Sequence, residues 1–502
     1  MADIRWVVVS DLHFGAENSV LTSLTEAPAT PSSTGFAVDE RTPSPMLSGI
    51  LEGVRRLTQH QARPPSLVMA GDILDLALSP DETSSEVFSG FARLAFGDAT
   101  PVFDPVVYYV PGNHDHHLWE AAREAQYVQH LSKVPRGGRL GAPTHVTGLS
   151  ADDESPRIAS AWLKCLIERE AASPGVEVRV AYPNMALRLP AGDRAVVISH
   201  GHFTESIYTL MSQLKDILYP EQRQTRFNDI AVWEQENFAW IDFLWSTLGR
   251  SGQVGSDLGL IYADMASPKD IDGLISNLTR SLLAKGRGPA WLHFIERGIM
   301  NAIFRHEANH FLRSERGTTT ATLSAAGQLG LRTYLEGPVR SQLQKELGGV
   351  PGDVSFVFGH THKPFADTWP IIGFPSPVRI FNTGGWVVDT AVPAPVQGGV
   401  VVLVDDDLDV VPLQIYRQSS GPSSDPVQLL PIKRAEGPPS DFRAQLADRI
   451  DPTAPPWAAI TAAATALTAQ RHRLQAATTA AYRQAGPRPD TDKVRGPATP
   501  GA

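Results

Sequence analysis

The chain has 502 residues, of which 42% are hydrophobic, and its formal net charge at pH 7 is −10. This length suits roughly three domains or one large domain with insertions, and the acidic balance argues against broad binding to nucleic acid, which requires a basic face. A single cysteine, Cys165, excludes an intrachain disulfide and a cage of thiolate metal ligands. We expect Cys165 to be a small buried residue on the apolar side of a helix.

The N-terminal sequence MADIRWVVVSD is typical of a first β-strand. It lacks the basic start, long apolar core and small-residue cleavage site of a signal peptide, so we expect a cytoplasmic protein. No stretch approaches the roughly 18 uninterrupted apolar residues of a membrane span. Even the aromatic segment AVWEQENFAWIDFLW is interrupted by Glu234, Glu236 and Asp242.

Short runs of apolar and β-branched residues predict seven strands along the chain. They lie at 4–10, 66–71, 106–110, 194–199, 354–359, 378–385 and 398–404. Continuous apolar strands suit sheets that are covered on both faces. Helical patterns alternate with them, for example at 46–60 and 84–96, and the segment 26–44 reads as a long loop. This alternation predicts an α/β sandwich.

Residues 203–350 interrupt the alternation, because they hold several amphipathic helical patterns and no convincing strand. We interpret them as a helical insertion of domain size. Its two ends emerge beside polar motifs of the main domain, so it should form a lid or wall over them. The full predicted organisation is an α/β domain at 1–202 and 351–417, the insertion at 203–350, a Pro/Ser/Gly-rich linker at 418–456, an Ala-rich helix at 457–485 and a disordered tail at 486–502.

Side chains that can bind metal follow five of the predicted strands. They are Asp11 and His13 in SDLHF, Asp72 and Asp75 in AGDILD, Asn113, His114 and Asp115 in PGNHD, His200 and His202 in HGH, and His360 and His362 in GHTH. In an open α/β sheet, ligands bind where the carboxyl ends of the strands meet. This mixture of oxygen and nitrogen ligands suits manganese, iron or zinc.

The series of motifs resembles that of the calcineurin-like metallophosphoesterases. Their pattern D-x-H, G-D-x-x-D, G-N-H-D/E, H and G-H-x-H appears here in order as DLH, GDILD, GNHD, HG and GHTH, over residues 6–200 and 354–405. The resemblance implies a four-layer α/β/β/α sandwich with the helical insertion and C-terminal tail added to it. It also implies hydrolysis of phosphoric esters with two divalent metal ions, which would be manganese, iron or zinc.

Carried over position by position, the resemblance assigns seven residues to the two metal ions. The ligands are Asp11, His13, Asp72 and His362 for one ion, and Asp72, Asn113, His200 and His360 for the other. Two dications about 3.5–4 Å apart repel strongly, so a shared carboxylate and a bridging hydroxide are needed to hold them. Asn113 is a neutral ligand, which keeps the site attractive to a phosphoryl dianion.

The resemblance also implies roles for the residues between the ligands. The bridging hydroxide would attack phosphorus in line, His114 would protonate the leaving oxygen, and Asp75 would orient His114. Asp75 has a second interpretation as the cap of a following helix. We expect Asp115 to support its turn as a hydrogen-bond acceptor. For His116, His117 and His202, a surface position, a supporting role and a substrate contact all remain open.

The substrate is expected to be a small phosphate ester. GDILDLA lacks the arginine that follows G-D-x-x-D in the serine/threonine protein phosphatases, which favours a phosphodiester, a nucleotide or a lipid-linked pyrophosphate over a phosphoprotein. The insertion carries aromatic residues that either form its own core or face an apolar or nucleotide substrate. These are Trp233, Phe238, Trp240, Phe243, Trp245 and Trp291.

Two alternatives belong to other functional classes. His306, Glu307 and His310 form an H-E-x-x-H motif, which in a zinc peptidase binds zinc and supplies the general base, although no third ligand is evident nearby. The other alternative is a non-catalytic scaffold that binds protein partners through the helical insertion or the C-terminal helix. The complete set of metal-binding side chains argues against the scaffold.

Overall fold

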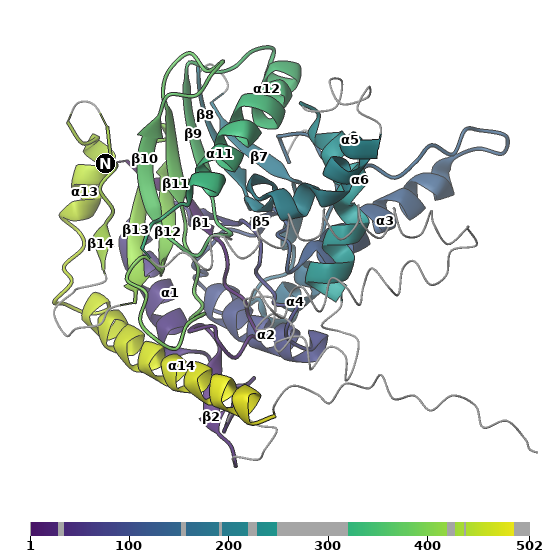
Figure 1. The fold of residues 1–502 in the computed structure, drawn as a ribbon. Helices are drawn as coiled ribbons and strands as arrows, with labels where there is room; N and C mark the ends of the chain where they lie inside the picture. The colour runs from purple at the N-terminus through teal and green to yellow at the C-terminus, as the bar shows by residue number, and fades with distance from the viewer. Residues whose placement is uncertain are drawn as a thin grey trace, which may run out of the picture.

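The computed structural model describes most of the chain. The described residues are 2–28, 35–151, 157–189, 193–218, 228–247, 320–418, 427–435 and 438–485. Their fold is mixed α/β, as predicted, with a seven-stranded sheet, a five-stranded sheet and a two-stranded hairpin (Figure 1).

The seven-stranded sheet joins the N-terminal strands to strands from the end of the chain. In sheet order it contains β14 (Gln428–Leu429), β13 (Val410–Arg417), β12 (Gly398–Asp405), β1 (Ile4–Val9), β4 (Ser66–Met69), β5 (Val106–Tyr109) and β6 (Glu177–Val180). Strands β1, β4, β5 and β6 run parallel, whereas β12 pairs antiparallel with β1. The carboxyl ends of β1, β4 and β5 therefore meet at one edge of this sheet.

The five-stranded sheet has a parallel centre with antiparallel strands at its edges. Its order is β10 (Phe365–Trp369), β11 (Val378–Asn382), β9 (Asp353–Phe358), β8 (Arg194–Ser199) and β7 (Asn184–Arg188). Strands β8, β9 and β11 are the parallel ones. Each of the seven predicted strands is present in one of the two sheets. The hairpin of β2 (Ser23–Glu26) and β3 (Phe36–Asp39) lies largely within the predicted loop 26–44.

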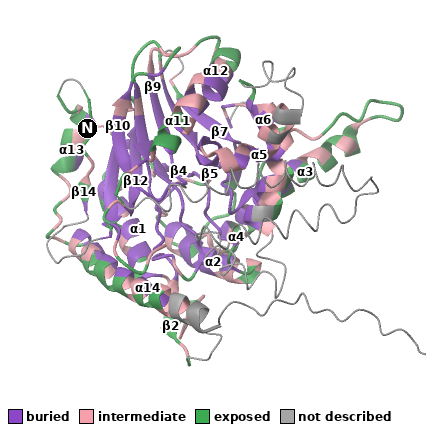
Figure 2. Cartoon of the chain, in the orientation of Figure 1, coloured by how far each residue is buried: buried purple, intermediate pink, exposed green. Residues whose placement is uncertain are grey.

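The two sheets share one hydrophobic cluster. Val8 and Val68 enter it from the seven-stranded sheet, and Val196 and Val357 enter it from the five-stranded sheet. Both sheets are buried along most of their length (Figure 2). Residues on alternate positions of the same strands pack in a second cluster with the helices, which explains why the strand sequences are apolar without a break.

Helices α1 (Pro45–Thr58) and α2 (Asp81–Phe96) follow the N-terminal strands. α1 begins at Ser44, whose hydroxyl accepts a hydrogen bond from the amide of Met46, with Pro45 in the first turn. Its buried face packs against the seven-stranded sheet in the second cluster. Helix α3 (His116–Lys133) starts directly after the PGNHD motif.

Cys165 lies on α4 (Ala161–Glu170), and the expectation that it is buried is wrong, because the residue is exposed. The buried face of α4 is formed by Leu163 and Ile167. Cys165 lies two residues from each of them, so the helical period turns its side chain away from that face.

All elements between His202 and Val350 are helical in the described part of the chain. They are η1 (His202–Thr204), η2 (Ser206–Thr209), α5 (Leu210–Leu218), α6 (Ile230–Ile241), η4 (Asp242–Thr247), α11 (Ala325–Tyr334), η7 (Leu335–Val339) and α12 (Arg340–Leu347). Trp233 and Trp245 are buried, whereas Phe243 is exposed. Trp291 lies outside the described residues.

The C-terminal region packs on the main body. Helix α13 (Asp441–Ala447) falls within 418–456 and buries Phe442 and Leu446. Helix α14 (Trp457–Ala485) runs alongside α1 (Figure 1). Among the described residues, no helix combines the length and apolar character needed to cross a membrane.

Candidate metal centre

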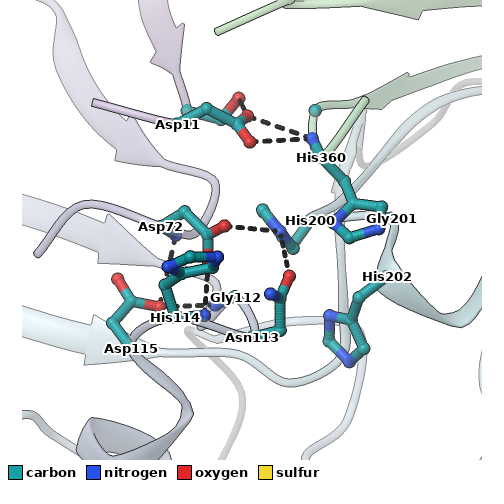
Figure 3. Close-up of polar contacts among 12 residues, drawn as sticks. Asp11, Asp72, Gly112, Asn113, His114, Asp115, His200, Gly201, His202 and His360 are labelled. Carbon is teal, nitrogen blue, oxygen red and sulfur yellow. Dashed lines mark hydrogen bonds and ion pairs between the residues drawn. The ribbon is translucent and has the colours of Figure 1, made fainter. Parts of the chain in front are cut away.

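The structure brings the seven predicted ligands together between the ends of the two sheets. Asp11 and His13 follow β1, Asp72 follows β4 and Asn113 follows β5, while His200 follows β8 and His360 and His362 follow β9. All seven are buried, with exposed fractions of 2% or less. Figure 3 shows most of this group, with carboxylates and imidazoles from the two sheets facing one another.

The ligand atoms form two neighbouring groups. Asp11, His13 and His362 each offer one ligand atom within 4.8 Å of the others, and Asp72, His200 and His360 do the same. Asn113 joins the second group, because its Oδ1 lies 3.0 Å from His200 Nε2. Each group combines carboxylate or amide oxygens with imidazole nitrogens, which suits a borderline divalent cation.

Asp72 lies between the two groups. Its Oδ2 is 3.7 Å from His13 Nε2 and 3.4 Å from His200 Nε2, and this buried oxygen has no hydrogen-bond partner. Its other oxygen, Oδ1, accepts a hydrogen bond from the amide of His114 at 2.8 Å. Burial raises the pKa of Asp72, but the charges of the histidines outweigh it and hold the pKa well below its usual range. A carboxylate in this position can contribute a ligand oxygen to both groups at once.

Three histidines have one ring nitrogen held by an acceptor outside the ligand groups. The Nδ1 atoms of His13, His200 and His362 lie 2.9 Å from Asp75 Oδ2, 3.0 Å from the carbonyl oxygen of Ala70 and 2.9 Å from Asp389 Oδ2. An acceptor at this distance assigns the ring proton to Nδ1. The Nε2 atoms then present lone pairs to the centre, which is the usual arrangement of metal-binding histidines.

The surroundings of His200 show why a cation fits. With Nδ1 donating to Ala70, Nε2 is an acceptor, yet it faces Asn113 Oδ1 and Asp72 Oδ2. Three acceptors that converge in a buried place repel one another unless a positive charge lies among them. Burial lowers the pKa of His200, but Asp72 outweighs it and raises the pKa to about 9. Either a proton on Nε2 or a metal ion among these acceptors would supply that positive charge. His200 belongs to the second group of ligand atoms, so an ion bound by that group would supply it.

The backbone at the centre is strained. Asp11, His13, Asp72, His360 and His362 have φ angles of 52°, 47°, 52°, 68° and 58°. Positive φ is uncommon for residues other than glycine and costs about 1–3 kcal/mol when the surroundings impose it. Such residues cluster at functional sites, and here five of the seven predicted ligands adopt this conformation. Strain concentrated at these five turns favours a functional role for their side chains.

Two glycines allow this close approach. Gly71 has a φ of 86°, and a Cβ atom there would lie 2.5 Å from His200 Nδ1. A Cβ atom at Gly112 would lie 2.2 Å from Asp72 Oδ1. Side chains at these positions would displace ligand residues, so the turns require glycine.

Asp75 contacts two histidines. Its Oδ2 faces His13 Nδ1, and its Oδ1 lies 3.1 Å from His114 Nδ1. The same Oδ1 accepts a hydrogen bond from the amide of Leu78 in the turn before α2. The interpretation of Asp75 as a helix cap is wrong, because Pro80 directly precedes the first turn of α2 and the helix has no side-chain cap. Burial lowers the pKa of His114, although the carboxylates of Asp75 and Asp72 act in the opposite direction.

Asp115 joins two of the motif turns. Its carboxylate accepts hydrogen bonds from the amides of Gly112, Asp72 and Ile73 at 2.7, 3.2 and 2.7 Å. Burial and the charge of Asp72 raise its pKa to about 6. The carboxylate thus supports the turns as an acceptor, as the sequence predicts.

His116 and His202 are buried behind the centre, whereas His117 is partly exposed. His116 Nε2 lies 3.0 Å from Glu234 Oε1 on α6. His202 Nε2 lies 3.2 Å from the hydroxyl of Tyr182, which donates to Glu234 Oε2 at 3.0 Å. A surface position is therefore excluded for His116 and His202.

Two carboxylates at the centre are not predicted from the sequence. Asp389 Oδ2 holds the Nδ1 atom of His362. Glu205 lies at the start of the insertion, and its Oε1 is 3.2 Å from His360 Nε2. Neither residue belongs to a motif. The position of Glu205 three residues after the HGH motif is the only available signal for it, since a short turn returns the chain to the centre.

The H-E-x-x-H motif at 306–310 lies outside the described residues. No model of a known protein family matches this chain, and no curated protein matches it.

Proposed function

We propose that this protein is a two-metal-dependent hydrolase of phosphoric esters with the four-layer α/β/β/α architecture of the metallophosphoesterases. The observation that carries the proposal is Asp72 Oδ2, a buried oxygen without a hydrogen-bond partner that faces a histidine from each ligand group. A carboxylate shared in this way suits two neighbouring dications. Asp11, His13 and His362 would complete one ion's ligands, and Asn113, His200 and His360 the other's.

When bound, the two ions would supply a nucleophile at neutral pH and positive charge for the phosphoryl oxygens. The protein's own residues would position the reacting groups. His114 would donate a proton to the leaving oxygen through Nε2, because Asp75 holds Nδ1. The lowered pKa of His114 makes its protonated ring a stronger acid and confines that form to lower pH.

The substrate would be a phosphodiester, a nucleotide or a lipid-linked pyrophosphate. Aromatic side chains of the insertion reach the centre, since the ring of Tyr208 lies 5.1 Å from that of His360 and the ring of Trp245 lies 5.3 Å from that of Tyr208. A base or an apolar chain attached to the phosphate would pack against such a wall. This supports a small ester over a phosphoprotein.

The test is manganese-dependent hydrolysis of bis(p-nitrophenyl) phosphate and p-nitrophenyl phosphate by the full chain. Asp72→Asn should reduce turnover to background, because it removes the charge that holds the two ions together. Asp406→Asn, an exposed aspartate elsewhere, is the matched control and should keep wild-type turnover. Equal turnover in Asp72→Asn and wild type would refute the proposal.

The variant Glu307→Gln distinguishes the zinc-peptidase alternative from the proposed phosphoesterase. This variant should keep most of the phosphoesterase activity, since Glu307 belongs to a different motif. Peptide hydrolysis that requires Glu307 and survives Asp72→Asn would instead favour a zinc peptidase.

A further inference from the structure

A second buried cluster of metal-binding side chains lies where α3 meets α6. His116 and Glu120 are one helical turn apart on α3, and Glu234 faces them from α6. Each of the three offers one ligand atom within 4.8 Å of the others. The exposed fractions are 0% for His116, 8% for Glu120 and 0% for Glu234. None of the three belongs to the seven residues of the centre described above.

Both carboxylates of the cluster have their second oxygen held by a neighbour. Tyr182 donates to Glu234 Oε2 at 3.0 Å, and Arg123 Nε donates to Glu120 Oε2 at 2.9 Å. His116 Nε2 lies 3.0 Å from Glu234 Oε1, whereas its Nδ1 has no hydrogen-bond partner and lies 3.7 Å from Asp242 Oδ1. Carboxylates that bind metal are characteristically fixed in the way seen here, with one oxygen toward the ion and the other tied to a supporting group.

An unpartnered oxygen provides independent support. Glu120 Oε1 is buried and has no hydrogen-bond partner, and leaving such an oxygen unsatisfied is unfavourable. Glu120 lies close enough to His116 and Glu234 for their charges to act on its carboxyl group, whose pKa is raised by burial. A cation at the shared position would satisfy this oxygen.

The charges of the cluster also favour a dication. Glu120, Glu234 and Asp242 are carboxylates, and Arg123 is a permanent cation that contacts Glu120. His117 also faces Asp242, at 3.5 Å, but from a partly exposed position. Burial lowers the pKa of His116, but Glu234 outweighs it and raises the pKa to about 10, so without an ion the ring is protonated and one negative charge is left. A dication beside a neutral imidazole would balance the three carboxylates and Arg123.

We propose that His116, Glu120 and Glu234 bind a single divalent transition-metal ion such as zinc, manganese or iron(II). The site is distinct from the pair of ions in the proposed function and does not depend on phosphoesterase activity. One imidazole and two carboxylates form a ligand set that these metals accept. Because the ligands come from α3 and α6, the ion would fasten the insertion to the helix that follows the PGNHD motif.

The experiment counts metal ions in the full-length protein. Wild type and variants are stripped with a chelator, reloaded with zinc or manganese, dialysed and measured by mass spectrometry of the metal content. Glu120→Gln should bind one ion fewer than wild type, because the amide has no charge to contribute. Glu124→Gln, one turn further along α3 at an exposed position, should bind as many ions as wild type.

A variant of the other centre keeps the two proposals separate. Asp11→Asn combined with Asp72→Asn should lose the paired ions and retain one, and Glu120→Gln added to it should remove that one. Equal metal content in wild type and Glu120→Gln, with both folded by circular dichroism, would overturn this site whatever the double variant shows. If Glu120→Gln does not fold, His116→Asn is measured in its place and judged by the same criterion.

Discussion

The orientation of three of the four histidines at the candidate metal centre depends on an acceptor that is not itself a predicted ligand. For His13 and His362 that acceptor is a carboxylate, from Asp75 and Asp389. A carboxylate at Nδ1 fixes both the proton and the plane of the ring, and it makes Nε2 more basic. Asp75 would therefore act on metal binding through His13 and on proton transfer through His114.

Asp389→Ala should weaken binding of the ion that His362 helps to hold. Loss of a supporting group of this type lowers metal affinity by about 10–100-fold, because the ring is free to turn. Manganese titration by calorimetry measures the change, and kcat should fall with little change in KM for p-nitrophenyl phosphate.

The conservative variant Asp389→Asn keeps an acceptor for the Nδ1 proton and should recover part of the affinity. Asp406→Asn, an exposed aspartate, is the control for the loss of one charge. A titration of Asp389→Ala that matches wild type would show that Asp389 has no part in positioning His362.

The ligand motifs are visible in the sequence because each follows directly on a strand, and the strand order brings them together. The supporting residues are less visible. Asp389 lies 27 residues beyond His362, in a segment without a motif, and only the three-dimensional fold brings its carboxylate to the ring. The burial of His116 likewise depends on Glu234, which is 118 residues away.

Helix α14 attaches to the main body along one stripe. Its buried residues recur every three or four positions, and they are Trp457, Ile460, Ala464, Thr468, Arg471 and Leu474. Trp457 and Ile460 lie against Gly53 and Gly49 of α1, where a Cβ atom would come within 2.8 and 2.6 Å of them. The small residues of α1 thus let the two helices approach closely.

Arg471→Met should destabilise the folded protein. The guanidinium is buried and donates to the carbonyl oxygens of Ser19 and Thr22. Methionine removes both donors, which leaves the carbonyl oxygen of Ser19 with the amide of Thr22 and takes from the carbonyl oxygen of Thr22 its buried donor. A loss of about 1–3 kcal/mol in the free energy of unfolding is expected for such groups. Urea denaturation followed by tryptophan fluorescence measures it.

Arg473→Met on the exposed face of α14 is the matched control and should change stability by no more than about 0.5 kcal/mol. If the two variants unfold at the same urea concentration, the buried contacts of Arg471 contribute nothing to stability.

Elements could be predicted where their pattern is long and uninterrupted. The seven predicted strands are apolar runs bounded by motifs or turns, and all seven exist. β13 was missed because Pro412 interrupts an otherwise apolar run and argues against a strand. β6 (EVRV) and β7 (NMALR) are not predicted, because polar residues interrupt their short apolar patterns. Pairing with neighbouring strands, which sequence patterns do not reveal, decides their conformation.

At the scale of the whole molecule, the candidate metal centre lies between the two sheets. Asp11, His13, Asp72 and Asn113 follow strands of the seven-stranded sheet, whereas His200, His360 and His362 follow strands of the five-stranded sheet. The amide of His360 also donates to Asp11 Oδ1 at 3.0 Å across this junction. Ions bound here would hold the ends of both sheets together, so their effect on stability should extend to both.

Removal of metal should therefore loosen both sheets at once. An ion present at 1,000 times its dissociation constant stabilises the state that binds it by about 4 kcal/mol. Addition of manganese to chelator-treated protein should slow hydrogen exchange both in the turns that follow β1, β4 and β5 and in those that follow β8 and β9. Asp72→Asn should abolish this response in both sheets, since neither ion is held without the shared carboxylate. Protection confined to the turns of one sheet would contradict a centre that bridges the two, and it would leave the ligands of the other sheet without a common ion.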